Sequence, residues 1–300
     1  MHFLLIIGAL TAGQLARQSG LFPGRAHGWV NRWIIAVALP SVALHVVPSI
    51  RWDASVLLPF LTSPLVFAGA WLFVTHLSRR YAVPPETRAA LLLTAGLGNT
   101  SFIGFPLTQA YFGDEGLRIA VMCDQGSFFT LSTLGTLTAL HAAHGGNVSI
   151  PSLAKKVAFF PPFIGFLAAV LLPAFVDLSP ADPLFSLLAS TLVPLALFSV
   201  GLQLNLSDLG LRSPLLAAGL AYKLLIAPLL LLAAAAAAGL SGVVAQVSVF
   251  EAAMPPMITA AILAAEHRLD PALANRMAGA GIVLSFVSSA VWWYIVMTVL

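Results

Sequence analysis

The stretch that decides the fold reads Gly98-Asn99-Thr100-Ser101-Phe102-Ile103-Gly104-Phe105-Pro106. It interrupts an apolar run that begins after Arg88 and ends near Gly113. Two glycines, a proline and an Asn-Thr pair disfavour an uninterrupted helix. A second break, Glu251-Ala252-Ala253-Met254-Pro255-Pro256, lies about 150 residues further on, inside another apolar segment. Two such breaks at corresponding places in two halves indicate a membrane protein with a binding site at the breaks.

The composition excludes a water-soluble protein. Of the 300 residues, 8% are charged and 59% are hydrophobic, and the mean hydropathy is +0.96. A soluble domain carries roughly a quarter of charged residues. The net charge of +3 gives no indication of a nucleic-acid partner, and membrane lipid is the expected surrounding. The single cysteine, Cys123, excludes an internal disulfide and a cysteine metal cluster, and we interpret it as a small core residue.

Apolar runs of about 20 residues predict spanning helices, because the hydrocarbon core is about 30 Å thick. We predict an all-α integral membrane protein in which the connections are short and leave no room for a soluble domain. The ten predicted spans cover residues 2–18, 29–48, 54–77, 88–112, 116–140, 153–175, 184–204, 212–238, 242–265 and 273–299.

The distribution of Lys and Arg predicts the orientation of the chain. With the N-terminus outside, eleven basic residues fall in inner loops and helix ends, whereas only Arg51 and Arg118 fall on the outer side. No positive residue precedes the apolar run at residues 3–10, so this run is expected to be a first span and not a signal peptide. An even number of spans places both termini outside.

The two halves are expected to form an inverted repeat. Five spans in residues 1–140 and five in residues 153–300, joined by an inner linker at 141–152, must run in opposite directions through the membrane. The proline at Leu39-Pro40 in the second span is echoed by the one at Val193-Pro194 in the seventh.

Four polar residues are expected deep in the membrane, where each is costly and therefore a functional candidate. Lys223, Asn99 and Glu251 come ten or eleven residues into their spans, about 16 Å from the membrane surface. Asp124 lies about 9 Å inward on its own span.

Structural roles remain open for each of these residues. Lys223 could form an ion pair with Glu251 or Asp124, and the Glu251 carboxylate could cap N–H groups freed at its break. Asp124 could be solvated, and Asn99 with Thr100 could satisfy the backbone of a broken helix. Half-helix ends, however, concentrate the partial charge that holds anionic substrates and coupling cations in carriers.

Motifs for other classes of function are absent from the sequence. It contains no His-Glu-x-x-His zinc motif, no phosphate-binding P-loop and no Gly-x-Ser-x-Gly. We therefore expect neither an enzyme nor an ATP-driven pump.

The Gly98–Pro106 stretch resembles the signature of the fourth helix in the auxin efflux carrier family. The resemblance extends over all ten predicted spans, and the chain lacks a long central loop, so it resembles the compact bacterial type. The other residues that carry the resemblance are Asp124, Pro194, Gly201, Lys223, Pro228, the Glu251–Pro256 stretch, Ala264 and Asp270.

The resemblance implies a particular architecture and function. It implies a 5+5 inverted repeat whose broken fourth and ninth spans cross, with a scaffold of spans 1, 2, 6 and 7 and a mobile transport domain of spans 3–5 and 8–10. Members of the family carry small organic anions such as auxins or malonate. The resemblance therefore implies a secondary transporter of such an anion, and the mobile transport domain implies an elevator-type mechanism. A bacterial plasma membrane and a homodimer formed through the scaffold helices are also implied.

The coupling ion stays open at this point. Proton coupling or uncoupled transport is preferred, but the related bile acid/sodium symporters keep sodium coupling open, and a non-transporting ligand sensor is the alternative of another class. No cofactor other than H⁺ or Na⁺ and no firm metal site are expected.

The predicted site has two parts. The predicted substrate-binding residues are Asn99, Thr100, Phe102, Pro106, Lys223, Met254, Pro255 and Pro256. The residues predicted to bind a coupling ion or proton are Asp124, Glu251, Ser127 and Thr130.

Overall fold

The computed structural model describes residues 2–20, 26–50, 53–144, 151, 155, 158–204 and 213–300. All named elements in these residues are helices, and no β-strand occurs among them. Most of the predicted linker 141–152 and the basic residue Arg212 lie outside the described residues.

The chain divides into two compact units, each of which is assembled from segments that are distant in sequence. The first comprises Met1–Asp53, Ser101–Val121 and Ala154–Leu204, and the second comprises Ala54–Thr100, Met122–Leu153 and Asn205–Leu300. The predicted repeats, residues 1–140 and 153–300, are instead each continuous in sequence. This division stays a prediction.

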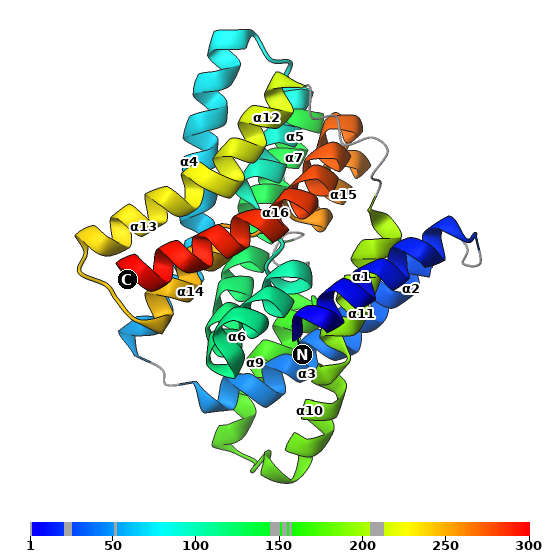
Figure 1. Ribbon diagram of the computed structural model, residues 1–300, viewed down its shortest axis with the longest axis vertical. Helices are drawn as coiled ribbons and strands as arrows, with labels where there is room; N and C mark the ends of the chain where they lie inside the picture. The colour runs from blue at the N-terminus through cyan, green and yellow to red at the C-terminus, as the bar shows by residue number, and fades with distance from the viewer. Residues whose placement is uncertain are drawn as a thin grey trace. The chain divides into compact units, whose positions relative to one another are not determined.

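The first unit contains α1 (His2–Gln18), α2 (Ala26–Trp33), the π-helix η1 (Ile34–Ala38), α3 (Leu39–Val46), η2 (Val47–Ser49), most of η4 (Thr100–Gly104), the first part of α6 (Phe105–Thr130), α9 (Pro161–Leu171), η6 (Leu172–Ala174), η7 (Ser179–Ala181), α10 (Asp182–Ser190) and α11 (Leu192–Gln203). Figure 1 shows α1 lying along α11.

Close packing of α1 against α11 depends on two glycines. A Cβ atom added at Gly13 would lie 2.2 Å from the Phe198 carbonyl oxygen, and one at Gly201 would lie 2.4 Å from the Leu10 carbonyl oxygen. Small residues of this kind let helix backbones approach where lipid provides no hydrophobic driving force. Arg17 completes the contact by donating to the Leu204 carbonyl, at the end of α11.

The second unit contains η3 (Ala54–Val56), α4 (Leu57–Tyr81), α5 (Pro85–Gly96), the end of α6, the π-helix η5 (Leu131–Gly135), α7 (Thr136–His144), α12 (Pro214–Ala221), the π-helix η8 (Tyr222–Ile226), α13 (Ala227–Ala237), α14 (Val243–Ala252), α15 (Ile258–Glu266) and α16 (Pro271–Val299). In Figure 1, α12 and α13 follow one another as a single rod beside α16.

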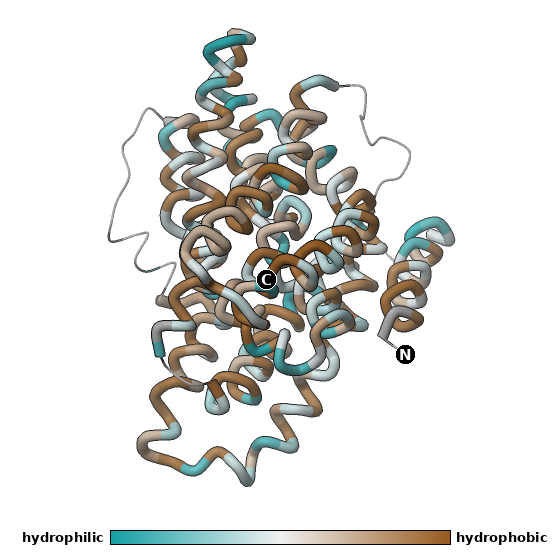
Figure 2. Tube along the Cα trace, turned by 60° about the vertical axis from the view of Figure 1, so that its left-hand side comes forward, coloured by the Kyte–Doolittle hydropathy of each residue, from teal (hydrophilic) through white to brown (hydrophobic). Residues whose placement is uncertain are grey.

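Five helical segments in the described residues are long and apolar enough to cross a membrane. Figure 2 shows hydrophobic residues, in brown, along most of the helices, with hydrophilic residues at the turn that joins α4 to α5 at the top of the view. The structure is therefore consistent with an integral membrane protein built of helices. The ten spans and the inverted repeat stay predictions. The five segments are Ala26–Ser49, Leu57–Tyr81, Ser179–Gln203, Pro214–Ala237 and Pro271–Val299.

The predicted turn between the fourth and fifth spans coincides with a break in α6. Gly113 has φ +68° and ψ −159°, so the helix is not continuous at this residue. A positive φ of this size favours glycine, which explains the residue type at the turn.

A proline inside α4 lies one turn beyond a carbonyl that α6 approaches closely. Pro64 has no N–H, so the Phe60 carbonyl lacks its usual partner within the helix. That carbonyl instead faces Gly126, where an added Cβ would lie only 2.0 Å from the Phe60 oxygen.

We predict that Gly126→Ala lowers the free energy of unfolding by about 1–3 kcal/mol, because the methyl group overpacks the contact with Phe60. Gly8→Ala is the matched control, since nothing lies within 4 Å of a Cβ at Gly8. Thermal unfolding of both purified variants measures the difference. Equal melting temperatures would contradict the close approach of α4 and α6.

Candidate functional site

Two broken helices meet in the second unit. Helix α5 ends at Gly96 and α14 ends at Ala252, and beyond these ends Gly98 pairs with Pro256 in an isolated antiparallel bridge. We call this pairing, from Leu97 to Asn99 and from Pro255 to Met257, the crossover.

The crossover consists of two backbone hydrogen bonds. The Asn99 N–H donates to the Pro255 carbonyl at 2.8 Å, and the Met257 N–H donates to the Leu97 carbonyl at 2.9 Å. Proline has no N–H of its own, so Pro255 and Pro256 end the helix while their carbonyls remain able to accept. Each break therefore supplies partners for the backbone groups that the other break frees.

The Lys223 side chain is held at the end of α14. Its ammonium donates to the Ala252 carbonyl at 2.7 Å, and the residue is only 1% exposed. A positive charge is favourable at this position because the C-terminal end of a helix carries partial negative charge. Glu251 also interacts with Lys223 electrostatically. Gly98 lies close to this ammonium, since a Cβ at Gly98 would be only 3.1 Å from the Lys223 Nζ.

The local helix geometry that positions Lys223 originates at a proline. Pro228 cannot donate to the Leu224 carbonyl, and residues Tyr222–Ile226 form the π-helix η8. The Trp292 indole of α16 takes the vacant place and donates to the Leu224 carbonyl at 2.7 Å. The Tyr222 hydroxyl fixes the other side of η8 by donating to the Val66 carbonyl of α4 at 2.7 Å.

Two buried carboxylates lie in the same unit. Asp124, 7% exposed, accepts a hydrogen bond of 2.6 Å from the Thr100 hydroxyl, and Glu251 is 1% exposed. Both carboxylates interact electrostatically with the buried Cys123 thiol, and the hydroxyls of Ser248 and Thr62 lie near the same thiol. Acids, hydroxyls and a thiol from α4, α6 and α14 therefore surround one buried place.

The structure gathers most of the predicted site residues in this unit. Eight of them are buried there close to the crossover or to the carboxylates: Asn99, Thr100, Asp124, Lys223, Glu251, Met254, Pro255 and Pro256. Whether any of them binds substrate, proton or ion stays a prediction.

The remaining four predicted residues occupy α6 and η4. Ser127 and Thr130 are buried near the end of α6, and the Thr130 hydroxyl donates to the Gly126 carbonyl of its own helix at 2.7 Å. Phe102 in η4 and Pro106 in α6 belong to the first unit.

Sequence reasoning missed several residues that shape the site. Ser248 could have been found, because it precedes Glu251 by three residues and so shares a helix face with it. Thr62 and Cys123 gave no such signal, since their role follows from the packing of α4 on α14. Trp292 pairs with a carbonyl that Pro228 leaves open, and nothing near Trp292 in sequence indicates this partner.

The polar groups of the site are of mixed chemical type. Within the described part of the chain, no group of three or more His, Cys, Asp or Glu side chains could hold a metal ion. The site instead combines two carboxylates, one ammonium, an amide and several hydroxyls.

The sequence also matches the model of a known protein family. A family model described as "Membrane transport protein" matches residues 1–293. The chain belongs to this family. This match confirms the family resemblance that the Gly98–Pro106 stretch indicated. Relatives of the chain are themselves named as transporters.

Two archaeal relatives match over nearly their whole length. An "uncharacterized transporter" of Methanothermobacter thermautotrophicus is 31% identical over 96% of this chain and 95% of its own length. Another, of Methanocaldococcus jannaschii, is 27% identical over 98% and 97%. A Rhizobium meliloti protein named "putative malonate transporter" is 28% identical over 69% of this chain and 65% of its own. The relatives' names describe transport and not catalysis.

We predict that Trp292→Phe lowers the free energy of unfolding by about 1–3 kcal/mol, because the buried Leu224 carbonyl loses its donor while the aromatic ring is retained. Trp29→Phe is the control, since Trp29 is 64% exposed. Thermal unfolding in detergent measures both. An equal, negligible effect of the two substitutions would show that the indole hydrogen bond does not support η8.

Proposed function

We propose that this membrane transport protein is a secondary active transporter of a small organic anion, a carboxylate of the auxin or malonate kind. The observation that carries the proposal is the crossover of two broken helices beside buried Asn99, Lys223, Asp124 and Glu251. Family membership supports transport, and the name of the Rhizobium relative supports a small carboxylate as the substrate.

An anion is favoured at the crossover by the direction of the half-helices. Helix α15 begins at Ile258, directly after the crossover, and its first N–H groups give this end partial positive charge. The opposite charge at the end of α14 already has Lys223 as its partner. The substrate carboxylate is therefore proposed to bind near the Asn99 amide and the start of α15.

Lys223 also bears on the coupling ion. Carriers that use sodium coordinate it with unwound carbonyls and half-helix C-terminal ends. Here the Lys223 ammonium already bonds the Ala252 carbonyl at the end of α14. This contact supports proton-coupled or uncoupled transport over sodium coupling, with Asp124 or Glu251 as the group that takes the proton.

The proposal includes an elevator-type mechanism. Spans 3–5 and 8–10 would carry the bound anion as a transport domain, and spans 1, 2, 6 and 7 would form the scaffold and a homodimer contact. We further propose a bacterial plasma membrane location with both termini outside, as the distribution of basic residues indicates.

We predict that Glu251→Gln lowers carboxylate uptake into proteoliposomes by about tenfold or more, because the amide keeps the size of the side chain but can neither carry its charge nor take up a proton. Glu115→Gln makes the same chemical change at an exposed position and should retain wild-type uptake. Wild-type uptake by Glu251→Gln would refute the role of Glu251. Binding of the anion without any flux in the wild type would favour the sensor.

A second prediction concerns coupling. An imposed pH gradient should drive uptake equally well in sodium and in potassium buffer. Asp124→Asn keeps an acceptor for the Thr100 hydroxyl but removes the charge, so we expect it to reduce stimulation by the gradient if Asp124 takes the proton. Uptake that requires sodium would contradict proton coupling and support the symporter alternative.

A further inference from the structure

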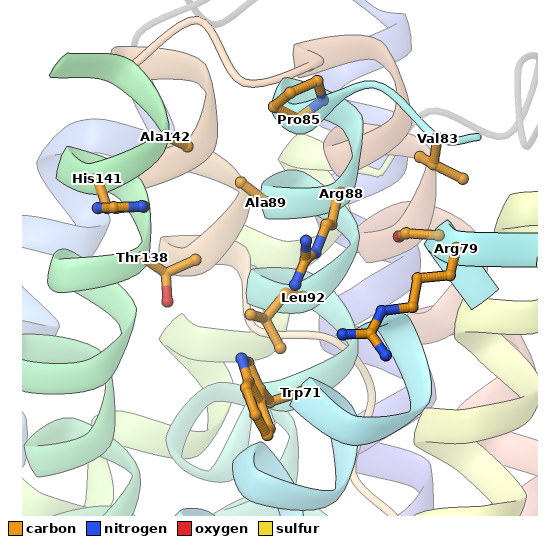
Figure 3. A pocket seen from close by; sticks show the side chains of 11 residues that line it. Trp71, Arg79, Val83, Pro85, Arg88, Ala89, Leu92, Thr138, His141 and Ala142 are labelled. Carbon is orange, nitrogen blue, oxygen red and sulfur yellow. The ribbon is translucent and has the colours of Figure 1, made fainter. Parts of the chain in front are cut away.

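A polar cavity lies in the same unit as the crossover, away from the crossover residues themselves. It has a volume of about 530 Å³ and is bounded by the end of α4, the start of α5 and the end of α7. This volume is in the range of cavities that hold small ligands. Figure 3 shows the side chains of Arg79 and Arg88 extending in the direction of Trp71, with Thr138 and His141 on α7 across the opening.

The cavity has a concentrated positive charge. Two of its eleven lining residues are arginines and none is acidic. In the described part of the chain, neither Arg79 nor Arg88 has a carboxylate oxygen within 4 Å of a guanidinium nitrogen. Positive charges that lack protein carboxylates attract anions, and the planar guanidinium matches the oxygens of a phosphate.

Two further features distinguish the cavity from a solvated basic surface. Arg88 is fixed in position, since its guanidinium donates to the Thr75 hydroxyl at 3.0 Å. Ser78, which lines the cavity, is only 8% exposed, and its hydroxyl has no hydrogen-bond partner among the described residues. A buried hydroxyl of this kind is usually satisfied, so a bound oxygen is a reasonable partner for it.

The position of the cavity along the helix suits a group at a membrane surface. Arg79 and Arg88 lie on the side that the basic residues predict to face the cytoplasm. Trp71 precedes Arg79 by eight residues on α4, which places it about 12 Å further along the helix. The Trp71 ring would therefore contact the apolar side of a ligand whose anionic group meets the arginines.

We propose that this cavity is a binding site for a phosphate group, provided by an anionic phospholipid at the membrane surface or by a soluble phosphate ester. The site is separate from the crossover residues and does not depend on the identity of the transported anion. Basic pockets between membrane helices bind lipid phosphate through the same chemistry.

The test measures the melting temperature of the full chain in dodecyl maltoside micelles, which contain no phosphate, alone, with added phosphatidylglycerol, or with glycerol 3-phosphate. A ligand of the folded state raises the melting temperature. We expect Arg79→Gln to weaken the apparent affinity by about tenfold. Arg80→Gln is the matched control, because Arg80 is the next residue, lies 6.0 Å from the Tyr81 ring and does not line the cavity.

The two ligands distinguish the source of the phosphate. Stabilisation by phosphatidylglycerol that Arg79→Gln weakens and Arg80→Gln retains identifies a lipid site, and the same pattern with glycerol 3-phosphate alone identifies a soluble ligand. No stabilisation by either phosphate, or equal stabilisation of both variants, would overturn the proposal. Arg79 is exposed and has no described hydrogen bond, so its replacement should not unfold the protein, and the melting temperature in dodecyl maltoside without ligand checks this.

Discussion

The pairing of two helix breaks is the constraint on which the second unit depends. A backbone N–H or carbonyl without a partner is costly in a membrane, so a broken helix can exist there only if other groups take over its hydrogen bonds. The hydrogen bonds from Asn99 to Pro255 and from Met257 to Leu97 do this reciprocally. Because each break satisfies the other, the two segments must come together even though about 150 residues separate them.

Other interruptions in this unit are stabilised in the same way. Pro228 leaves the Leu224 carbonyl to Trp292, and Ala252 at the end of α14 receives the Lys223 ammonium. These contacts replace the missing bonds of regular helices with side chains from other helices. They also hold polar groups at fixed positions inside an apolar unit, which is what a selective binding site requires.

Much of the candidate site could be predicted because polar residues are rare in apolar spans. Asn99, Asp124, Lys223 and Glu251 stand out by their cost in a membrane, and the structure buries all four in one unit. The register of Gly98 on Pro256 could not be predicted, since it is set by how distant helices pack.

The partner of Lys223 was also beyond sequence reasoning. The residue types suggest an acid as its partner, and Glu251 does interact with it electrostatically, but the ammonium hydrogen-bonds the Ala252 carbonyl, a backbone group that no residue type indicates. The breaks near Gly98 and Glu251 could be predicted, whereas the π-helical interruptions could not. Span 29–48, for example, lies within the helical segment Ala26–Ser49, which contains the π-helix η1. Such local changes depend on tertiary contacts more than on the residues within the helix.

The measurement that tests the central claim most directly is the stabilisation of purified wild-type protein and Asn99→Ala by a panel of small mono- and dicarboxylates. The substitution removes the amide side chain but keeps the backbone N–H that bonds Pro255, so the crossover should persist. If the crossover binds the anion, at least one carboxylate raises the melting temperature of the wild type and has a much smaller effect on Asn99→Ala. Equal stabilisation of both proteins, or none by any carboxylate, would contradict an anion site at the crossover.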